Sequence, residues 1–341
     1  MTTTPKPSSI LRFQPEIEAE LKRSIADSKS PLFRMLRYHL GWADQMGMPE
    51  RHAAQERSLG TLTLLSAEAT GGDTKRVTAA AAAIELTRAY FQIHEQLRAG
   101  TPEVNGRAAL WWHAGASQGI NAGDGMYALA RLTLMQMEEQ GMPATSIVGA
   151  LGMLDKACLR ITESLFAEIS AEGTLQQTPE AYLEVLKGKA ALHGCACAVG
   201  ASLAHAQPKT IDALREFGEL VGAAALIREE VDALWGVHGS AKSQLIEMLD
   251  KRRSLPILAA FKMATGKEKA ALEATIVRDE PLSDERLSAV LRIMESVGGK
   301  RFCEEAIGER IHASNAALKW AGLPTAGAIA LEEIVRHMAG A

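Results

Sequence analysis

One glycine-containing segment has nearly the spacing of a phosphate-binding loop. Residues 236–243 read GVHGSAKS, where such a loop has the pattern GxxxxGK[ST]. In that loop, backbone amides and a lysine hold the phosphates of a nucleotide. Ala241 replaces the second glycine, and the sequence around it does not predict a preceding β-strand. The segment therefore argues against a phosphate loop.

Two groups of metal-binding residue types are also incomplete. His94 and Glu95 begin the zinc-binding pattern HExxH, but Arg98 stands where the second histidine is required. Cys195 and Cys197 lie two residues apart in an apolar run, and on a helix such side chains point in different directions. We interpret the two cysteines as small buried residues rather than as metal ligands.

The segments that carry these residues have the spacing of helices. Apolar residues recur every three or four positions over 151–165 and 287–294. Residues 79–99 begin with alanines and are apolar around most of a helix, which suits a central helix. No strand–helix alternation and no fixed-period repeat is visible. We predict an all-α, single-domain bundle of roughly a dozen helices. Breaks are expected at 71–73, 141–143, 207–209, 298–300 and 322–324.

Composition narrows the class of protein. The chain has 341 residues, a net charge of −4 and 47% hydrophobic residues, which gives no general attraction to nucleic acid or an anionic membrane. Four cysteines do not make a disulfide framework in a chain of this length. No apolar stretch of about 18 residues predicts a membrane span, and residues 1–10 lack the apolar region of a secretory signal. We expect a cytoplasmic protein.

The order of several segments resembles the trans-isoprenyl diphosphate synthases, also called polyprenyl synthetases. The resemblance runs from about residue 31 to 336. Residues 64–72 (LLSAEATGG) resemble the family's LLACEAVGG, and residues 119–130 (GINAGDGMYALA) resemble its AINAGDALFALA. The resemblance implies an all-α bundle around a deep apolar cavity over residues 26–341, after a tail and short lead-in at 1–25. Further similar segments are 80–94 (AAAAIELTRAYFQIH), 182–189 (YLEVLKGK), 225–236 (ALIREEVDALWG) and 242–258 (KSQLIEMLDKRRSLPIL).

The resemblance also implies a chemistry. In the family, two aspartate-rich DDxxD-type motifs bind Mg²⁺, which grips an allylic diphosphate. The metal ions withdraw charge from the leaving diphosphate, and isopentenyl diphosphate attacks the allylic carbocation that forms. Carboxylates at positions i and i+4 share one face of a helix, which explains the spacing of the motif.

The first of these motifs is altered here. By the resemblance it falls on residues 95–99, which read EQLRA, so only Glu95 remains as a candidate metal ligand. Arg98 introduces a cation at the same place. We expect Arg98 to pair with Glu95 or with the second acidic motif, which would join helices without a metal.

The loop that holds isopentenyl diphosphate is altered as well. The family's GKRLRP corresponds to residues 55–60, QERSLG, where Glu56 replaces the lysine and Leu59 replaces the second arginine. A carboxylate repels a diphosphate, so the substitution is worse than a neutral one. We therefore predict that the subsite for isopentenyl diphosphate is dismantled.

The second acidic motif is better kept. The resemblance places Glu229, Glu230 and Asp232 in it, and Glu247 at a further aspartate position, so these four are candidate metal ligands. Glutamate has the charge of aspartate on a longer arm, so binding of Mg²⁺ is possible but doubtful. The alternative is a solvated charged helix face beside Arg228.

Basic residues that match the family's allylic-diphosphate ligands are also present. The alternatives are surface lysines, and arginines that cap helices or pair with nearby acids. Tyr90 and Phe91 lie where bulky side chains limit product length in the family, or else they are aromatic packing in a filled core. Asp124 also stands at a position where the family usually has an aspartate. The candidates for binding the allylic diphosphate are Lys189, Lys242, Arg252, Arg253, Arg57 and Arg107.

These features favour an isoprenoid-biosynthesis protein of this family whose ordinary elongation is lost or altered. It could be a non-catalytic partner of an active synthase, as a homodimer or as a heterodimer with a related synthase. The alternative is a divergent Mg²⁺-dependent prenyltransferase or terpene synthase that acts on one allylic prenyl diphosphate. A lipid carrier that uses an apolar cavity without chemistry, and an ordinary synthase, remain further hypotheses.

Overall fold

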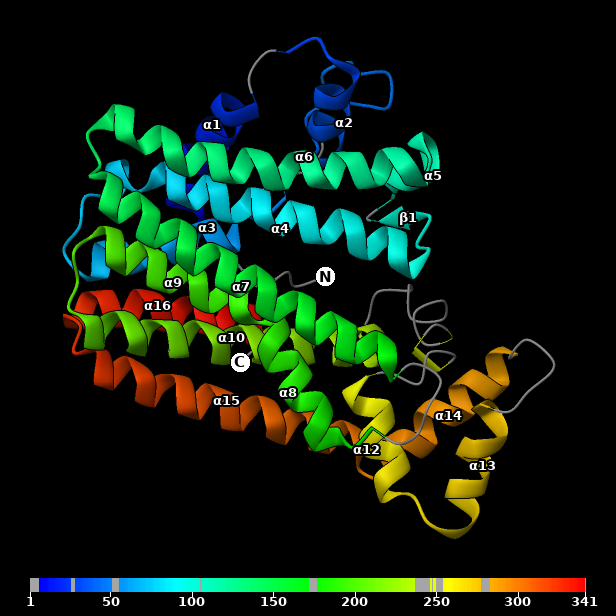
Figure 1. Ribbon diagram of the computed structural model, residues 1–341. Helices are drawn as coiled ribbons and strands as arrows, with labels where there is room; N and C mark the ends of the chain where they lie inside the picture. The colour runs from blue at the N-terminus through cyan, green and yellow to red at the C-terminus, as the bar shows by residue number, and fades with distance from the viewer. Residues whose placement is uncertain are drawn as a thin grey trace. The chain divides into compact units, whose positions relative to one another are not determined.

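The described part of the chain is built almost entirely of helices (Figure 1). This confirms the predicted all-α fold. The helices predicted over 79–99, 151–165 and 287–294 are all present, and the expected breaks fall between helices or at the first residues of the next one. The structure, a computed structural model, describes residues 6–25, 28–50, 55–104, 106–171, 177–236, 246, 248–249, 254–276 and 283–340.

The elements follow one another along the chain with short connections. Two strands of two residues, β1 and β2, pair antiparallel, with Val104 opposite Arg107, and form a small hairpin rather than a sheet core. In order, the first elements are α1 (Ser8–Ile25), α2 (Pro31–His39), α3 (Ser58–Ala69), η1 (Thr74–Arg76), α4 (Thr78–Ala99), β1 (Glu103–Val104), β2 (Arg107–Ala108), α5 (Leu110–Ala114), α6 (Ala116–Met135) and η2 (Gln136–Gln140). They are followed by α7 (Ala144–Ser170), α8 (Pro179–Lys189), α9 (Ala191–Leu203), α10 (Pro208–Trp235), α12 (Leu255–Met263), α13 (Gly266–Ile276), α14 (Asp284–Ser296), α15 (Gly299–Ala321) and α16 (Thr325–Ala339).

The residues group into two compact units. Unit 1 comprises residues 1–155, 195–214 and 321–334, and unit 2 comprises residues 156–194, 215–320 and 335–341.

Helix α1 belongs to the packed part of unit 1. Ile10, Phe13, Ile17 and Leu21 recur every three or four residues and are all buried, which gives the helix one apolar face. The face packs on α3 and α4. The region that we expected to be a tail and short lead-in is therefore ordered from Ser8 onwards, because its apolar side chains are removed from water.

Helices α4 and α6 lie side by side in unit 1 (Figure 1). The run of alanines at the start of α4 is completely buried, so this helix is the central one that the sequence predicts. Small residues let the two helices approach closely. A Cβ atom at Gly123 of α6 would lie 2.3 Å from the ring of His94 on α4. The aromatic and ionic groups at the end of α4 are positioned by this contact.

Unit 2 has two buried hydrophobic clusters. One joins α8, α10, α12 and α15 and includes Tyr182, Ile227 and Leu255. The other joins the end of α10 to α12, α13 and α14 through Leu234, Ile257 and other apolar residues. These clusters hold the second acidic motif of α10 against α8 and α12.

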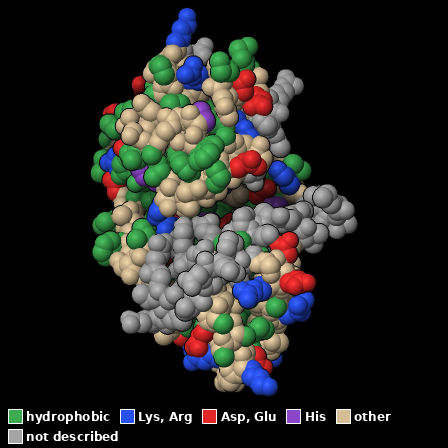
Figure 2. All heavy atoms as spheres, turned by 90° about the vertical axis from the view of Figure 1, so that its right-hand side faces the viewer, with side chains coloured by type: hydrophobic (Ala, Val, Ile, Leu, Met, Phe, Trp, Pro, Cys, Tyr) green, Lys and Arg blue, Asp and Glu red, His purple; other side chains and the backbone are tan. Residues whose placement is uncertain are grey.

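The surface is mixed in character. In Figure 2, acidic and basic side chains are interspersed over the α13–α14 end of unit 2, and hydrophobic side chains are exposed near α5 in unit 1. Trp112 of α5 is 62% exposed. Within the described ranges, no helix is both long and apolar enough to cross a membrane.

The contact between α9 and α3 in unit 1 provides a test of the packing. A Cβ atom at Gly200 would lie 2.0 Å from the carbonyl oxygen of Thr63. Gly200→Ala is expected to lower the free energy of unfolding by about 3 kcal/mol because the two helix backbones must move apart. Gly308→Ala is the control, since a Cβ there meets no neighbour, and should raise stability by about 0.5–1 kcal/mol. Urea unfolding measures both, and equal stability of Gly200→Ala and wild type would contradict the close approach.

Candidate functional site

The altered first acidic motif lies in the last turns of α4, in unit 1. Arg98 donates hydrogen bonds to both carboxylate oxygens of Glu95, and the Nε–Oε2 distance is 3.0 Å. The two residues are three apart on the helix, and their side chains are 20% and 40% exposed. Of the two predicted partners of Arg98, Glu95 is observed. Both residues lie on α4, so this pair does not join two helices as we expected. The carboxylate proposed as a metal ligand is therefore held by a cation from its own helix.

The aromatic residues one turn earlier pack on one another. The ring of Tyr90 lies 4.6 Å from the rings of Phe91 and His94, and 5.3 Å from the ring of Tyr127 on α6. The hydroxyl of Tyr127 donates to Asp155 at 3.2 Å. Aromatic packing thus accounts for the half-buried position of Tyr90 and Phe91. A role in limiting product length stays a prediction.

Next to Tyr90 and the first motif, His94 faces α6. Its Nε2 atom lies 3.7 Å from a carboxylate oxygen of Asp124 and 3.4 Å from the carbonyl oxygen of Ile120. Asp124 is exposed, so it is available to solvent as well as to His94. The incomplete zinc pattern at His94–Glu95 therefore contributes an interhelical contact.

Arg57, a candidate for diphosphate binding, is buried inside unit 1. Its residue is 1% exposed, and its Nε atom donates to a carboxylate oxygen of Glu18 on α1 at 2.7 Å. Glu18 also accepts a hydrogen bond from the indole of Trp42 at 2.9 Å. The guanidinium therefore ties the start of α3 to α1, and it is enclosed by protein.

Arg107, the second arginine candidate of unit 1, is also held by neighbouring protein groups. It donates to the carbonyl oxygens of Tyr38 and Ala43 at 2.9 and 2.8 Å and lies 3.5 Å from a carboxylate oxygen of Glu50. Its guanidinium also stacks 4.2 Å from the centre of the Tyr38 ring. Arg107 thus fastens the segment after α2 to the β1–β2 hairpin. For both arginines, the structure matches the alternative in which they pair with nearby groups.

His39 lies among these arginines. Burial, together with the charges of Arg57, Arg88 and Arg107, lowers the pKa of His39 to about 4, against a hydrogen bond with Gln92 that raises it. The imidazole is therefore neutral at neutral pH. This part of unit 1 is a positive interior that is partly compensated by Glu18, Glu50 and Glu85.

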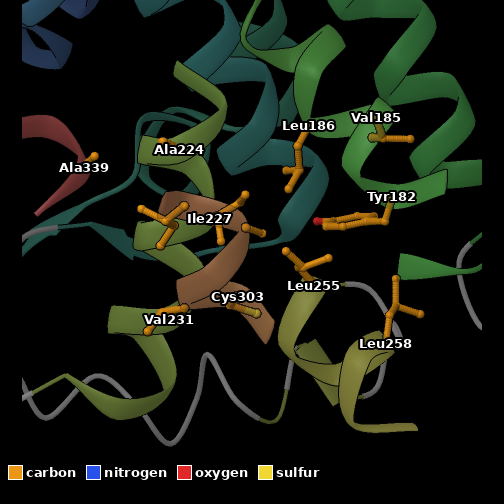
Figure 3. Close-up of a cluster of buried hydrophobic side chains, with 12 residues drawn as sticks. Tyr182, Val185, Leu186, Ala224, Ile227, Val231, Leu255, Leu258, Cys303 and Ala339 are labelled. Carbon is orange, nitrogen blue, oxygen red and sulfur yellow. The ribbon is translucent and has the colours of Figure 1, made fainter. Parts of the chain in front are cut away.

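The second acidic motif lies on α10 in unit 2, and its members point in different directions. Glu229 and Asp232 are exposed, and Asp232 lies 3.9 Å from the Arg228 guanidinium one turn earlier on the same helix, as in the alternative of a charged helix face. Glu230 turns inward, where the Tyr182 hydroxyl donates to Oε1 at 2.6 Å and the Leu255 backbone amide donates to Oε2 at 2.8 Å. Burial raises the pKa of Glu230 to about 7, although both hydrogen bonds oppose the rise. Figure 3 shows the ring of Tyr182 inside the cluster, between α8, α10 and α12.

Lys189 lies at the end of α8, in the same unit. Its Nζ atom is 3.1 Å from a carboxylate oxygen of Glu168 on α7, and the two side chains are 21% and 3% exposed. Both charges act on Glu230, Lys189 by lowering its pKa and Glu168 by raising it. The structure thus brings Lys189 and Glu230 into one electrostatic group. Four other predicted site residues lie outside the described residues: Lys242, Glu247, Arg252 and Arg253. The same is true of the phosphate-loop-like segment, apart from Gly236.

Several residues that contact the candidate site residues could not be identified from the sequence alone. Glu18 is separated from Arg57 by 39 residues, and Glu168 is separated from Lys189 by 21 residues. No local spacing connects such positions. Tyr182 lies in the segment that resembles the family, and its contact with Glu230 across 48 residues becomes visible only in the folded chain.

The donor groups can be tested for their fit to Mg²⁺. Across the described ranges, no three His, Cys, Asp or Glu side chains are grouped so that they could hold a metal ion. On α10, the exposed Glu229 and Asp232 lie three residues apart and offer hard oxygen ligands, which fits Mg²⁺. On α4, Glu95 does not fit, because Arg98 occupies its oxygens.

The chain matches a known protein family over most of its length. The family model described as polyprenyl synthetase matches residues 54–294. The chain belongs to the polyprenyl synthetase family. It is 30% identical over 305 residues to the geranylgeranyl diphosphate synthase of Mycobacterium tuberculosis. The aligned region covers 87% of this chain and 84% of that protein. It is 24% identical over 334 residues to a (2E,6E)-farnesyl diphosphate synthase of the same organism, covering 96% and 92%.

Solved structures show the same fold for this polyprenyl synthetase family member. A polyprenyl synthetase from Streptomyces coelicolor superposes with a TM-score of 0.88 at 22% identity, covering 97% of this chain and 98% of that one. A polyprenyl synthase from Caulobacter crescentus, in complex with calcium and isoprenyl diphosphate, gives a TM-score of 0.81 at 20% identity, covering 100% and 99%. The predicted all-α isoprenoid synthase bundle is thereby confirmed.

The buried histidine among the arginines generates a pH-dependent prediction. The folded-state pKa of about 4 lies below the ordinary value of 6.5, so the neutral form is favoured and its stabilisation is present above pH 6.5. That stabilisation is lost as the pH falls from 6.5 toward 4. Between pH 7.5 and 5.5, wild type should lose about 1 kcal/mol more unfolding free energy than His39→Gln. Urea unfolding at both pH values measures the difference.

The control for this experiment is His312→Gln, which replaces an exposed histidine on α15. It should keep the pH dependence of wild type. If His39→Gln loses as much stability as wild type over this range, the histidine is not held neutral by its surroundings.

Proposed function

We propose that this polyprenyl synthetase family member binds an allylic prenyl diphosphate and that its ordinary elongation with isopentenyl diphosphate is lost or altered. The observation that carries the proposal is the pair of Arg98 with Glu95 at the end of α4. A carboxylate whose oxygens accept hydrogen bonds from a guanidinium has its charge compensated. Its negative charge attracts a divalent cation much less strongly than the two or three free aspartates of a DDxxD motif do.

The isopentenyl diphosphate loop supports the same proposal. Arg57, its remaining arginine, is enclosed and paired with Glu18. Glu56 accepts a hydrogen bond from Ser58 at 2.9 Å and lies 3.9 Å from the exposed Lys6 ammonium, so a carboxylate in a long ion pair stands at the predicted subsite. Binding a diphosphate there would require breaking the pair of Arg57 and overcoming repulsion from Glu56.

The allylic side is better equipped. Lys189 has a side chain that is 21% exposed, and its ammonium group lies next to the buried Glu168. Glu229 and Asp232 would hold Mg²⁺, and Glu230 would support them by fixing α10 to α8 and α12. When bound there, the metal would supply positive charge to the leaving diphosphate. Lys189 would bind an oxygen of the same diphosphate and orient it.

A divergent Mg²⁺-dependent prenyltransferase or terpene synthase is the second candidate function. Its support is the exposed pair Glu229 and Asp232 on α10, since a reaction of a single allylic diphosphate does not need the isopentenyl diphosphate loop. The names of the related proteins, geranylgeranyl and farnesyl diphosphate synthases, also favour an active enzyme.

The proposed partner is a second copy of this chain or a related synthase. In unit 1, Leu132 and Met135 of α6 are 52% and 54% exposed. On α7, Leu159 and Phe166 of unit 2 are 60% and 73% exposed and lie two turns apart on one face. Water-exposed apolar side chains of this size along a helix favour a helix-to-helix interface. A non-catalytic partner of an active synthase would use the same surface.

Binding and elongation are measured separately. Purified protein is titrated with farnesyl diphosphate, with and without Mg²⁺, in a calorimeter. Lys189→Gln should weaken binding about tenfold or more because a charge-assisted hydrogen bond to phosphate is lost. The control Lys187→Gln, an exposed lysine on the same helix, should bind as wild type does.

The same protein is then incubated with farnesyl diphosphate and isopentenyl diphosphate. We expect little or no product with added isoprene units. Efficient elongation contradicts the proposed loss, and absence of binding contradicts the allylic site. Turnover of farnesyl diphosphate alone, prevented by Asp232→Asn, identifies the second candidate function.

The interface is tested by sedimentation. Phe166→Asp should shift a dimer toward monomer because a charge cannot be buried at an apolar contact without a partner. Met46→Asp is the control, since Met46 is 78% exposed in the loop after α2. A monomeric wild type, or a dimer that Phe166→Asp leaves intact, rules out the α7 interface. Co-purification with an intact synthase, with a change in its product length, identifies the non-catalytic partner.

A further inference from the structure

A tight turn after α2 presents two large apolar side chains to solvent in unit 1. Met46 and Met48 are 78% and 63% exposed, and only Gly47 separates them in the chain. Apolar side chains that are exposed together in a small area mark a candidate contact surface. None of these residues belongs to the proposed prenyl diphosphate site.

The turn holds the two methionines in a fixed arrangement. The carboxylate of Asp44 accepts hydrogen bonds from the backbone amides of Met46 and Met48 at 2.9 and 2.8 Å. The amide of Asp44 donates to the carbonyl oxygen of Met48, and the amide of Gly47 donates to that of Asp44, at 2.9 and 3.0 Å. Gly47 has a φ of 85°, which a residue with a Cβ atom rarely adopts. The exposed methionines are therefore a feature of a folded turn.

An arginine of α2 packs directly on this turn. A Cβ atom at Gly47 would lie 2.5 Å from the Cδ atom of Arg34, so the arginine side chain lies against the glycine between the two methionines. Arg34 is exposed, and its charge also reaches α5. There, burial lowers the pKa of His113, and the charges of Arg34 and Arg107 contribute to the lowering. Arg34 thus lies near both the turn and α5.

Helix α5 extends the apolar surface. Trp112 is the neighbour of His113 in the chain and is 62% exposed. The ring of His113 lies 4.6 Å from the ring of Tyr38, and α5 packs beside α2. Tryptophan is enriched where membranes meet water, because its ring is apolar while its N–H group can donate a hydrogen bond. Two methionines and a tryptophan are therefore exposed on neighbouring elements.

The exposed charges beside these residues are positive. Lys22, near the end of α1, is exposed, and its Nζ atom lies 5.7 Å from the centre of the Trp42 ring at the start of the turn. Across the described ranges, neither Lys22 nor Arg34 forms an ion pair with a carboxylate. Their charges are therefore available to an anionic surface.

The acidic side chains of the turn are already engaged. Asp44 accepts the amide hydrogen bonds of the turn, and Glu50 lies 3.5 Å from the Arg107 guanidinium. The whole chain has a net charge of −4, but at physiological ionic strength an exposed charge acts over about 8 Å. The local balance at this surface is therefore positive although the balance of the whole chain is negative.

An anionic lipid membrane fits this combination of shape, charge and apolar side chains. The methionines lie at the tip of a turn, and such a projecting shape enters a layer of lipid headgroups without a matching cavity in a partner. Each basic side chain near an anionic membrane adds to the binding free energy, and apolar side chains that leave water add more. The stems of arginine and lysine are themselves apolar and can lie at the same interface.

We propose that this surface, which consists of Lys22, Arg34, Met46, Met48 and Trp112, docks on an anionic lipid membrane. The methionines and the tryptophan enter the headgroup layer, and the two basic side chains contact lipid phosphates. The attachment is peripheral and reversible. The inference goes beyond the proposed function and does not depend on it.

Co-sedimentation of the full-length protein with lipid vesicles is the measurement. Vesicles of phosphatidylcholine alone are compared with vesicles of equal parts phosphatidylcholine and phosphatidylglycerol. Wild type should bind the anionic vesicles at least tenfold more tightly, and added salt should weaken that binding because it screens the lipid charge. Prenyl diphosphates and Mg²⁺ are left out, so that the allylic site is not involved.

The apolar part of the surface is tested with a double variant. Met46→Ser combined with Met48→Ser should weaken binding to the anionic vesicles at least tenfold, because two apolar side chains no longer enter the headgroup layer. Leu11→Ser is the matched control, since Leu11 is 62% exposed on α1 and is not part of the surface. It should bind as wild type does.

The charges are tested one at a time. Arg34→Gln and Lys22→Gln should each weaken binding to the anionic vesicles about fivefold and reduce its salt dependence. Glutamine keeps the Cγ and Cδ atoms that Arg34 places against Gly47, so the turn is retained. Lys267→Gln, at an exposed lysine of α13 in unit 2, is the control and should stay within about twofold of wild type.

Tryptophan fluorescence shows which part of the protein meets the lipid. Lipids with brominated acyl chains quench a tryptophan that enters the bilayer. Binding should quench the fluorescence of wild type, and Trp112→Phe should remove most of the quenching although four of the five tryptophans remain.

Three results would overturn the proposal. These are no binding of wild type to anionic vesicles, equal binding to both kinds of vesicle, or unchanged binding of the methionine double variant. A change in the sedimentation of that variant without vesicles also contradicts the proposal, because the surface is then a contact between protein chains. Thermal unfolding shows that each variant is folded. Lys189→Gln, which tests the allylic site, should bind vesicles as wild type does.

Discussion

Charges that helix packing removes from water must be neutralised within the protein, and this constraint determines which side chains remain available to a ligand. Arg57 is enclosed and paired with Glu18, and Glu95 is held by Arg98. In unit 2, the buried Glu168 holds the partly exposed Lys189. Charged positions that the family resemblance assigns to substrate or metal are thus linked by internal pairs. Their energetic role is to compensate burial, and any ligand must compete with the partner already present.

The same competition distinguishes the altered motif on α4 from the acidic motif on α10. A guanidinium that bonds both oxygens of Glu95 from the same helix turn compensates the carboxylate charge, so a metal ion there must compete with a cation tethered beside its partner. On α10, the inward Glu230 takes the structural hydrogen bonds, whereas Glu229 and Asp232 are exposed and the contact of Asp232 with Arg228 is longer, at 3.9 Å. One motif therefore combines a carboxylate that anchors helices with two that face solvent. That division supports the proposal that binding of the allylic diphosphate is retained while binding of isopentenyl diphosphate is lost or altered.

The fold could be predicted from the sequence because its causes are local. Helical spacing over 151–165 and 287–294, the alanine-rich central helix and the glycine-containing breaks all depend on residues close in the chain. The resemblance of several segments supplied the family. The N-terminal segment was less predictable, since the apolar face of α1 with Ile10 and Phe13 acquires its meaning only from α3 and α4. The pairing of Arg98 with Glu95 was also accessible, because three residues on a helix bring side chains together.

The amino-acid sequence by itself determined the helices, the family and the residue types at the altered motifs. Only the tertiary structure decided that Arg57 is enclosed with Glu18, that Arg107 binds the backbone after α2, and that Glu230 faces Tyr182 and the start of α12. It also brought α2 and α5 side by side at one exposed surface, although the whole of α3 and α4 separates them in the chain. The physical reason is the range of the forces involved. Helix formation is decided by neighbours within a few residues, whereas desolvation and charge pairing depend on which surfaces the packed helices bring together.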